Sequence, residues 1–151
     1  VLEEMGCRSV EEEDGIKLFP PENAMRGGTF DLSAFSDQAL TLAVISCFAD
    51  SPVTITGIGH IRFQECDRFQ AIVSNLTRMG IECEKVDEET ICIHPGKPKP
   101  CEIETFEDHR VAMSFAIPGL VTSGIVILNP GCCRKTFETY FDVLESEICM
   151  G

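Results

Sequence analysis

The sequence has few basic residues, no tryptophan, and no apolar run long enough to cross a membrane as a helix. Its 12 lysine and arginine residues face 25 aspartate and glutamate residues, which gives a formal charge of −13 and an isoelectric point near 4.5. Such an acidic chain argues against general nucleic-acid binding, which requires a basic face. Nothing in it resembles a signal peptide or a basic targeting leader. We therefore expect a cytoplasmic protein with neither nucleic acid nor a membrane among its partners.

The spacing typical of a structural metal site is also lacking. The nine cysteines include no C-x-x-C pair, and the three histidines are not spaced as zinc ligands. Only Cys132 and Cys133 are adjacent, and the total is odd. These features predict no structural metal and reduced thiols, several of which serve as small core residues.

Four short ionic clusters lie where the pattern suggests that a strand is followed by a helix. Helix N-termini present free N–H groups and the positive end of the helix dipole, so such junctions suit anionic ligands. Lysine and arginine at these junctions therefore point to a small, strongly negative ligand and to one part of an enzyme site. The clusters are Ser36-Asp37, Glu65-Cys66-Asp67-Arg68, Glu107-Asp108-His109-Arg110 and Gly131-Cys132-Cys133-Arg134-Lys135-Thr136.

The chain also repeats itself at an interval of about 71 to 75 residues. Leu-Glu-Glu-Met-Gly at 2–6 resembles Leu-Thr-Arg-Met-Gly at 76–80, and each copy reads as a helix end followed by two short strands joined by an acidic turn. Asp37, an apolar helix at 39–48 and a strand at 53–56 match Asp108, a helix at 111–120 and a strand at 125–128. Apolar residues from Phe69 to Met79 have helical spacing, and a last helix is expected at 136–148.

The repeating unit is therefore strand, helix, strand, helix, strand, strand (βαβαββ). One complete unit spans 29–95, a partial unit spans 101–151, and residues 1–20 are the tail of an earlier unit; the proline-rich segment 95–100 joins the two units. The 151 residues suit one globular domain, and the alternation of strands and helices favours an α/β (α+β) domain over a solenoid. Because the chain starts inside a helix and has a partial unit at each end, we expect an excised piece of a longer polypeptide.

Four segments resemble, in order, the motifs of the EPSP synthase (3-phosphoshikimate 1-carboxyvinyltransferase) family. The resemblance covers nearly the whole chain, 1–151, and corresponds to most of the family's C-terminal domain. It implies the enolpyruvyl-transferase fold, in which each of two similar domains contains three βαβαββ units in a pseudo-threefold arrangement and the active site lies between the domains. The segments are Ser-Asp-Gln-Ala-Leu-Thr (36–41), Arg-Phe-Gln-Glu-Cys-Asp-Arg (62–68), Glu-Asp-His-Arg-Val-Ala-Met (107–113) and Pro-Gly-Cys-Cys-Arg-Lys-Thr-Phe (130–137).

The resemblance also implies an activity, which is transfer of the carboxyvinyl group of phosphoenolpyruvate to the 5-hydroxyl of shikimate 3-phosphate with release of phosphate. This step belongs to the biosynthesis of chorismate and the aromatic amino acids, and it implies no cofactor. The expected partners are the two substrates and the N-terminal domain of the same polypeptide, which carries an essential phosphate-binding lysine and is absent here. We expect this chain alone to be inactive because half of the substrate contacts are missing.

Two carboxylates are the candidates for catalysis. The resemblance implies that Asp37 holds the substrate hydroxyl and accepts its proton, and that Glu65 protonates the methylene carbon and later removes that proton. From the local sequence alone, Asp37 could instead be a helix N-cap and Glu65 a first-turn acid favoured by the helix dipole.

Three cations and one histidine are the candidates for binding the anionic groups. The resemblance implies that Arg68 and Arg110 hold the carboxylate of phosphoenolpyruvate, that Lys135 contacts the transferred phosphate, and that His109 supports the same site or relays a proton. A cation near a helix N-terminus opposes the dipole and therefore needs an anionic partner. The simpler alternatives are an exposed Glu65–Arg68 ion pair on one helical face and a solvated helix start at 108–110.

Two residues depart from the family pattern at positions that help to hold shikimate 3-phosphate. Gln64 stands where the family usually has a lysine, and His60 stands where an asparagine is common. Loss of the lysine removes a charge-assisted hydrogen bond worth about 1–3 kcal/mol. A third difference, Ser36 in place of a proline, is expected to affect only the local backbone.

Two other functions remain as alternatives. UDP-N-acetylglucosamine enolpyruvyl transferase shares the fold and the donor, but its pattern in this half lacks the Asp-His-Arg (108–110) and Gly-Cys-x-Arg-Lys-Thr-Phe (131–137) signatures. The other alternative is a non-catalytic binding or scaffolding domain of the same fold. It predicts no affinity for either substrate once the partner domain is restored.

Overall fold

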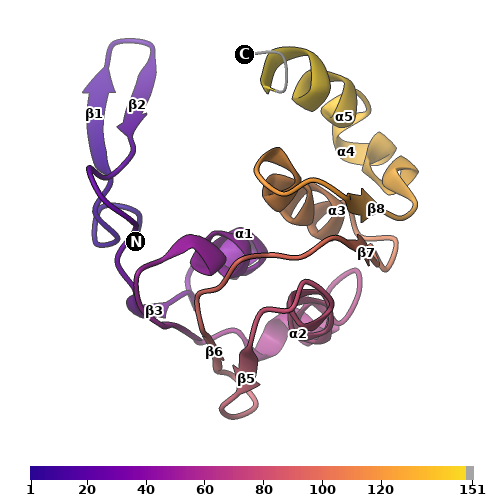
Figure 1. Cartoon of the computed structure of the whole chain (residues 1–151), viewed down its shortest axis with the longest axis horizontal. Helices are drawn as coiled ribbons and strands as arrows, with labels where there is room; N and C mark the ends of the chain where they lie inside the picture. Colours follow the sequence, from indigo (N-terminus) through magenta and orange to yellow (C-terminus); the bar gives the residue numbers. More distant parts are fainter. Residues whose placement is uncertain (149–151) are drawn as a thin grey trace.

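A computed structural model describes residues 1–148 of the chain. The first element is a hairpin of β1 (Arg8–Glu12) and β2 (Gly15–Phe19), which pair antiparallel across a two-residue acidic turn. The hairpin stands away from the remaining elements (Figure 1), and the Ile16 and Leu18 side chains on it are 72% and 50% exposed.

The largest sheet has four strands in the order β3-β4-β6-β5. Strands β3 (Gly28–Asp31) and β4 (Val53–Thr56) are parallel, as a crossover through helix α1 (Ala39–Ile45) requires. Helix α2 (Arg68–Arg78) then leads to β5 (Cys83–Lys85) and β6 (Ile91–Ile93), which pair antiparallel with each other, while β6 also pairs antiparallel with β4. The order of elements is thus βαβαββ, which confirms the predicted repeating unit.

The same strand–helix–strand arrangement begins again after residue 100. Strands β7 (Cys101–Ile103) and β8 (Ile125–Ile127) are parallel and are connected through helix α3 (His109–Ala116). Two short helices follow, α4 (Arg134–Phe137) and α5 (Tyr140–Val143). In Figure 1 these helices lie beyond α3, on the side away from the four-stranded sheet.

The core lies where α1, α2 and α3 pack against one another and against the sheet. In α2 the apolar side chains recur at helical spacing, and Phe69, Ile72 and Leu76 are at most 1% exposed. The helix begins at an N-cap, Asp67, whose carboxylate accepts a hydrogen bond from the Gln70 N–H at 2.9 Å. These contacts fix the position of the residue that opens the helix, Arg68.

Two predicted helices differ from the structure. Residues 2–6 form hydrogen-bonded turns and not a helix, and Gly6, at the end of these turns, has a positive φ of 103° that a helix cannot adopt. The helix predicted at 136–148 is divided into α4, α5 and a final π-helical turn, Leu144–Ile148. The division falls at Thr139, whose φ of −96° and ψ of 16° depart from helical values.

Within residues 1–148, no helix combines the length and the apolar character that a membrane crossing requires. The eight cysteines in this part of the chain form no disulfide bonds with one another.

Candidate functional site

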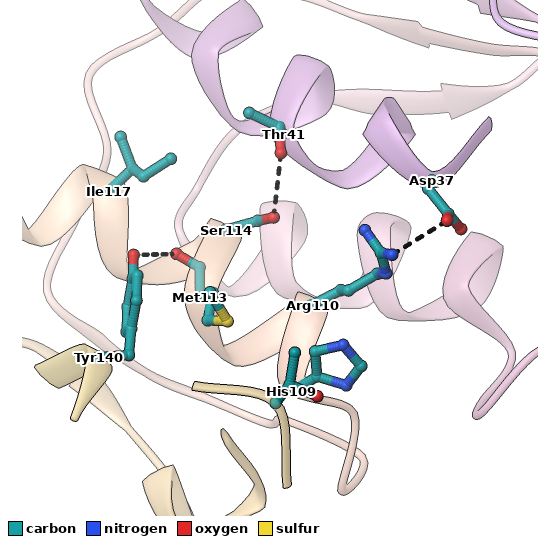
Figure 2. Close-up of a pocket in the computed structure, with 9 residues that line it drawn as sticks. Asp37, Thr41, His109, Arg110, Met113, Ser114, Ile117 and Tyr140 are labelled. Carbon is teal, nitrogen blue, oxygen red and sulfur yellow. Dashed lines mark hydrogen bonds and ion pairs between the residues drawn. The ribbon is translucent and has the colours of Figure 1, made fainter. Parts of the chain in front are cut away.

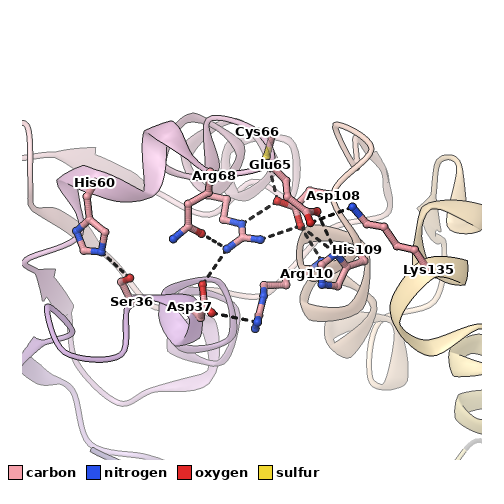
Figure 3. A network of polar contacts seen from close by, with 11 residues as sticks. Ser36, Asp37, His60, Glu65, Cys66, Arg68, Asp108, His109, Arg110 and Lys135 are labelled. Atoms are coloured by element: carbon pink, nitrogen blue, oxygen red, sulfur yellow. Dashed lines mark hydrogen bonds and ion pairs between the residues drawn. The ribbon is translucent and has the colours of Figure 1, made fainter.

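The four ionic clusters each lie between a strand and the next helix, and their side chains meet in one polar network (Figure 3). The network connects residues up to 98 positions apart in sequence, because the crossovers β3–α1, β4–α2 and β7–α3 bring the starts of three helices together. The members are Asp37, Gln64, Glu65, Arg68, Asp108, His109, Arg110 and Lys135.

At the centre of the network is a buried ion pair between Arg68 and Asp108, which are 3% and 0% exposed. The Arg68 guanidinium donates from Nε to Asp108 Oδ2 at 2.7 Å and from Nη2 to Oδ1 at 3.3 Å. Burial alone lowers the pKa of Arg68, but its bonds with Asp108 outweigh that effect and hold this pKa above the usual value. Arg68 is therefore permanently charged and rigidly oriented.

Asp108 is the buried member of the network that was not among the predicted site residues, although it lies in one of the four motifs. It is the N-cap of α3 and accepts a hydrogen bond from the Arg110 N–H at 2.8 Å. Burial raises the pKa of Asp108, but the bonds from Arg68 and the Arg110 N–H lower it more, so the carboxylate remains ionised. The position of Asp108 directly before an apolar helix could have indicated an N-cap. Its ion pair with Arg68 on α2 is visible only in the folded structure.

The loop before Asp108 has a strained backbone. Phe106 and Glu107 both adopt left-handed conformations, with φ of 51° and 55°, and Asn129 does the same (φ 48°) before the segment that carries Lys135. For residues other than glycine such conformations cost about 1–3 kcal/mol each and tend to persist at functional sites. Two of the four junctions that form the network therefore contain strain.

Asp37 lies in a 3-10 turn, Ser36–Gln38, and links the two arginines. Its Oδ1 accepts a hydrogen bond from Arg68 Nη1 at 3.0 Å, and its Oδ2 lies 3.0 Å from Arg110 Nη2. The carboxylate makes no capping bond to the following backbone, so the N-cap alternative for Asp37 is wrong. Arg110 lies near the start of α3, where a cation opposes the helix dipole, and Asp37 is the anionic partner that compensates for this.

Glu65 binds Lys135 and His109 instead of Arg68. Lys135 Nζ lies 2.9 Å from Glu65 Oε1, and the Nδ1–H of His109 donates to Oε2 at 3.0 Å. The predicted alternative, a Glu65–Arg68 pair on one helical face, is wrong because α2 begins only at Arg68. Lys135 is the main cause that lowers the pKa of Glu65 below its usual value; burial and Asp108 act in the opposite direction.

The two residues that depart from the family pattern lie at the edge of the network. Gln64 accepts a hydrogen bond through Oε1 from Arg68 Nη1. His60 Nε2 lies 2.7 Å from the hydroxyl of Ser36, so Ser36 has a side-chain contact and not only an effect on the backbone. His60 extends the polar surface beyond Asp37, in the direction away from Lys135 (Figure 3).

A cavity of about 290 Å³ opens beside Asp37, His109 and Arg110 (Figure 2). This volume is at the lower limit of the roughly 300–1,000 Å³ typical of small-molecule sites. The floor is less polar, with Met113 and Ile117 among its residues. A small anion with an apolar part would fit this combination of charged edge and apolar floor.

Thiol chemistry and metal binding are both disfavoured here. Burial raises the pKa of Cys66 to about 12 and that of Cys133 to about 11, so neither is a thiolate nucleophile at neutral pH. The ligand atoms of Glu65, Asp108 and His109 lie within 4.8 Å of one another, as a metal site would need. Their carboxylates, however, already bind cationic side chains, which would repel a metal ion.

Replacement of Lys135 by methionine is expected to raise the pKa of Glu65, because it removes the main cause that lowers that pKa while burial and Asp108 remain. The carboxyl chemical shift of Glu65, followed by NMR against pH, measures the change. Arg134→Met is the matched control, since Arg134 is an exposed neighbouring cation that makes no ion pair with Glu65. A pKa that stays unchanged or falls in Lys135→Met would contradict the assigned contact.

The chain matches known proteins along most of its length. The EPSP synthase (3-phosphoshikimate 1-carboxyvinyltransferase) family matches residues 1–144. A 3-phosphoshikimate 1-carboxyvinyltransferase of Nostoc punctiforme is 45% identical over 141 residues, covering 93% of this chain and 33% of the relative. The solved structure of EPSP synthase from Acinetobacter baumannii has a TM-score of 0.79 and 26% identity, covering 95% of this chain and 36% of that one.

The fold extends to a more distant enzyme. The enolpyruvyl transferase NikO from Streptomyces tendae has a TM-score of 0.72 at 21% identity, covering 93% of this chain and 32% of that one. The fold is thus the enolpyruvyl-transferase fold, as predicted, and the chain spans about a third of the length of the curated relatives that it matches. Because the match covers nearly all of the sequence and the motifs meet in one network, the chain belongs to the EPSP synthase family.

Proposed function

We propose that the whole protein to which this chain belongs transfers the carboxyvinyl group of phosphoenolpyruvate to the 5-hydroxyl of shikimate 3-phosphate and releases phosphate. In this proposal residues 1–151 form most of the C-terminal domain, and the network lines one wall of a cleft. The N-terminal domain supplies the opposite wall, and the reaction takes place in the cytoplasm. The proposal rests on family membership and on the geometry of the network.

The observation that carries the proposal is a balanced set of charges beside a cavity. Three carboxylates in the network face three permanent cations, so every cation is already paired. An anionic substrate can bind here only by taking cations from these carboxylates. The carboxylates released in this way are the groups that a proton-transfer reaction needs.

Arg68 and Arg110 are the proposed binding site for the carboxylate of phosphoenolpyruvate. Asp37 holds both guanidinium groups at 3.0 Å and is 46% exposed, so an incoming carboxylate can compete with it on the accessible side. Asp108 remains bound to Arg68 from the buried side and keeps its guanidinium group oriented. Once these cations have moved to the substrate, the Asp37 carboxylate oxygens are available to accept the proton of the 5-hydroxyl.

Lys135 and Glu65 form the second half of the proposed mechanism. The Lys135 side chain is 56% exposed, and we assign it to the phosphate of phosphoenolpyruvate. When phosphate draws Lys135 away, Glu65 loses the main cause of its lowered pKa and can take up a proton. Glu65 can then protonate the methylene carbon and later remove that proton, while His109 keeps its carboxylate in position.

The surface beyond Asp37 is assigned to shikimate 3-phosphate. His60 and Gln64 are exposed there, next to Asp37 and Arg68. Neither side chain carries the permanent charge of a lysine. We therefore expect the partner domain to provide most of the charge that binds this phosphate.

Phosphate release by the full-length protein tests the proposed function. Release is expected with phosphoenolpyruvate plus shikimate 3-phosphate and not with UDP-N-acetylglucosamine as acceptor. The 151-residue chain alone should give no turnover, since it contains only one wall of the site. Release with the nucleotide sugar instead, or no binding of either substrate to the full-length protein, would overturn the proposal in favour of the second enzyme or of a scaffolding role.

A further inference from the structure

A second group of metal-ligand side chains lies on the β5–β6 ladder, outside the network described above. In this antiparallel pair Glu84 is opposite Cys92, and the His94 N–H donates to the Glu82 carbonyl at 2.9 Å, which places those two residues opposite each other. Because side chains two positions apart point to the same face of a strand, all four lie on one face. Figure 1 shows the two strands side by side.

Three of these side chains are close enough to share one ion, and Cys92 lies beside His94. The ligand atoms of Glu82, Glu84 and His94 all lie within 4.8 Å of one another. His94 Nε2 is 3.6 Å from Glu84 Oε1 and 3.9 Å from Cys92 Sγ. Neighbouring ligands of tetrahedral Zn²⁺, with bonds of about 2.0–2.3 Å, are about 3.3–3.8 Å apart, so side-chain rotations, including one of Cys92 toward the glutamates, would bring the four ligand atoms to these distances.

The charges on this face also favour a cation. Among residues 1–148, no lysine or arginine forms an ion pair with Glu82 or Glu84. The cluster of Glu65, Asp108 and His109 differs in this respect, because Arg68 and Lys135 already neutralise its carboxylates. The Glu82 and Glu84 carboxylates on the β5–β6 ladder are thus free to bind an added positive ion.

We propose that this face of the β5–β6 ladder binds Zn²⁺ through Glu82, Glu84, Cys92 and His94. Carboxylates alone would suit Ca²⁺ or Mg²⁺, whereas an imidazole and a thiol beside them select zinc and related transition metals. On binding, the Cys92 thiol loses its proton to solvent and the thiolate bonds to the metal. The ligands follow the pattern Glu-x-Glu-x7-Cys-x-His, which becomes a cluster only when the strands pair; a search for linear zinc motifs therefore overlooks it.

Calorimetric titration of the protein with Zn²⁺ at neutral pH tests the site. His94→Gln and Cys92→Ser are each expected to weaken binding by about tenfold or more, because each removes one of four ligands. Glu102→Gln and Cys101→Ser, on β7, are the matched controls and should leave this affinity unchanged. Far-ultraviolet circular dichroism verifies that the variants retain the fold.

Titration with Co²⁺ provides an independent measurement of the thiol ligand. A thiolate-to-cobalt charge-transfer band is expected in the wild-type protein and in Cys101→Ser, and should be absent in Cys92→Ser. Equal Zn²⁺ affinity in the wild type and His94→Gln would overturn the proposal. So would loss of binding in His109→Gln with full binding in His94→Gln, because the metal would then lie in the network.

Discussion

Replacement of Asp108 by asparagine is expected to lower the free energy of unfolding by about 3–5 kcal/mol, because it leaves the buried Arg68 guanidinium without its main partner. Asparagine keeps the size of the side chain and can still cap α3 by accepting from the Arg110 N–H. The loss therefore reports the removed charge and not a missing cap. Folded domains are stable by only about 5–15 kcal/mol, so the effect should be large in a urea denaturation curve.

Asp67→Asn is the matched control, since Asp67 caps α2 in the same way from an exposed position. Its expected loss is below about 0.5 kcal/mol, because asparagine and aspartate are nearly equal N-caps. Circular dichroism is the suitable probe, since the chain contains no tryptophan. Equal stability losses in the two variants would show that the Arg68–Asp108 pair does not stabilise the fold.

The same pair predicts a pH dependence of stability. The pKa of Asp108 in the folded protein lies below its usual value of 3.8. The ionised carboxylate therefore contributes its full stabilisation above pH 3.8 and loses it as the pH falls through the lower, folded-state pKa. The stability difference between the wild type and Asp108→Asn should be constant near neutral pH and should shrink in acid.

The internal repeat, together with hydrophobic periodicity, was sufficient to predict the repeating unit and the junctions that hold the ionic clusters. The apolar spacing of α2 and the parallel pairing of β3 with β4 follow from local patterns and from the crossover rule. Once three crossovers are in place, the starts of their helices must lie near one another. The convergence of Asp37, Arg68 and Arg110 is a consequence of this topology.

The pairing within the site could not be predicted from the sequence. Arg68 binds Asp108, which is 40 residues away, while Glu65, three residues away, binds Lys135 instead. Which partner Arg68 binds depends on α2 beginning at Arg68, after Glu65, and not a turn earlier. Sequence patterns do not locate the first residue of a helix that accurately. Ion pairs between separate elements are decided by such local offsets.

Replacement of Glu65 by glutamine is expected to lower the turnover number of the full-length protein by about 10²–10⁴-fold, the usual contribution of a general acid–base group. Glutamine keeps the shape of the side chain and can still contact Lys135 and His109 through its amide, but it cannot carry a proton to carbon. Binding of phosphoenolpyruvate should change far less, because Arg68 and Arg110 retain their positions. Glu102→Gln on β7 is the matched control and should keep full turnover.

The exchange of solvent deuterium into the methylene group of phosphoenolpyruvate separates a catalytic role of Glu65 from a structural one. Under the proposed mechanism, reversible protonation of that carbon by Glu65 introduces deuterium during turnover. Glu65→Gln should then abolish this exchange while it leaves the urea denaturation midpoint unchanged. If exchange persists at the wild-type rate in this variant, another group transfers the proton, and Glu65 serves only to hold Lys135 and His109. The deciding comparison is between the exchange rate and the affinity for phosphoenolpyruvate. Loss of a proton-transferring carboxylate lowers the exchange rate and leaves the affinity unchanged, whereas loss of a structural contact lowers both.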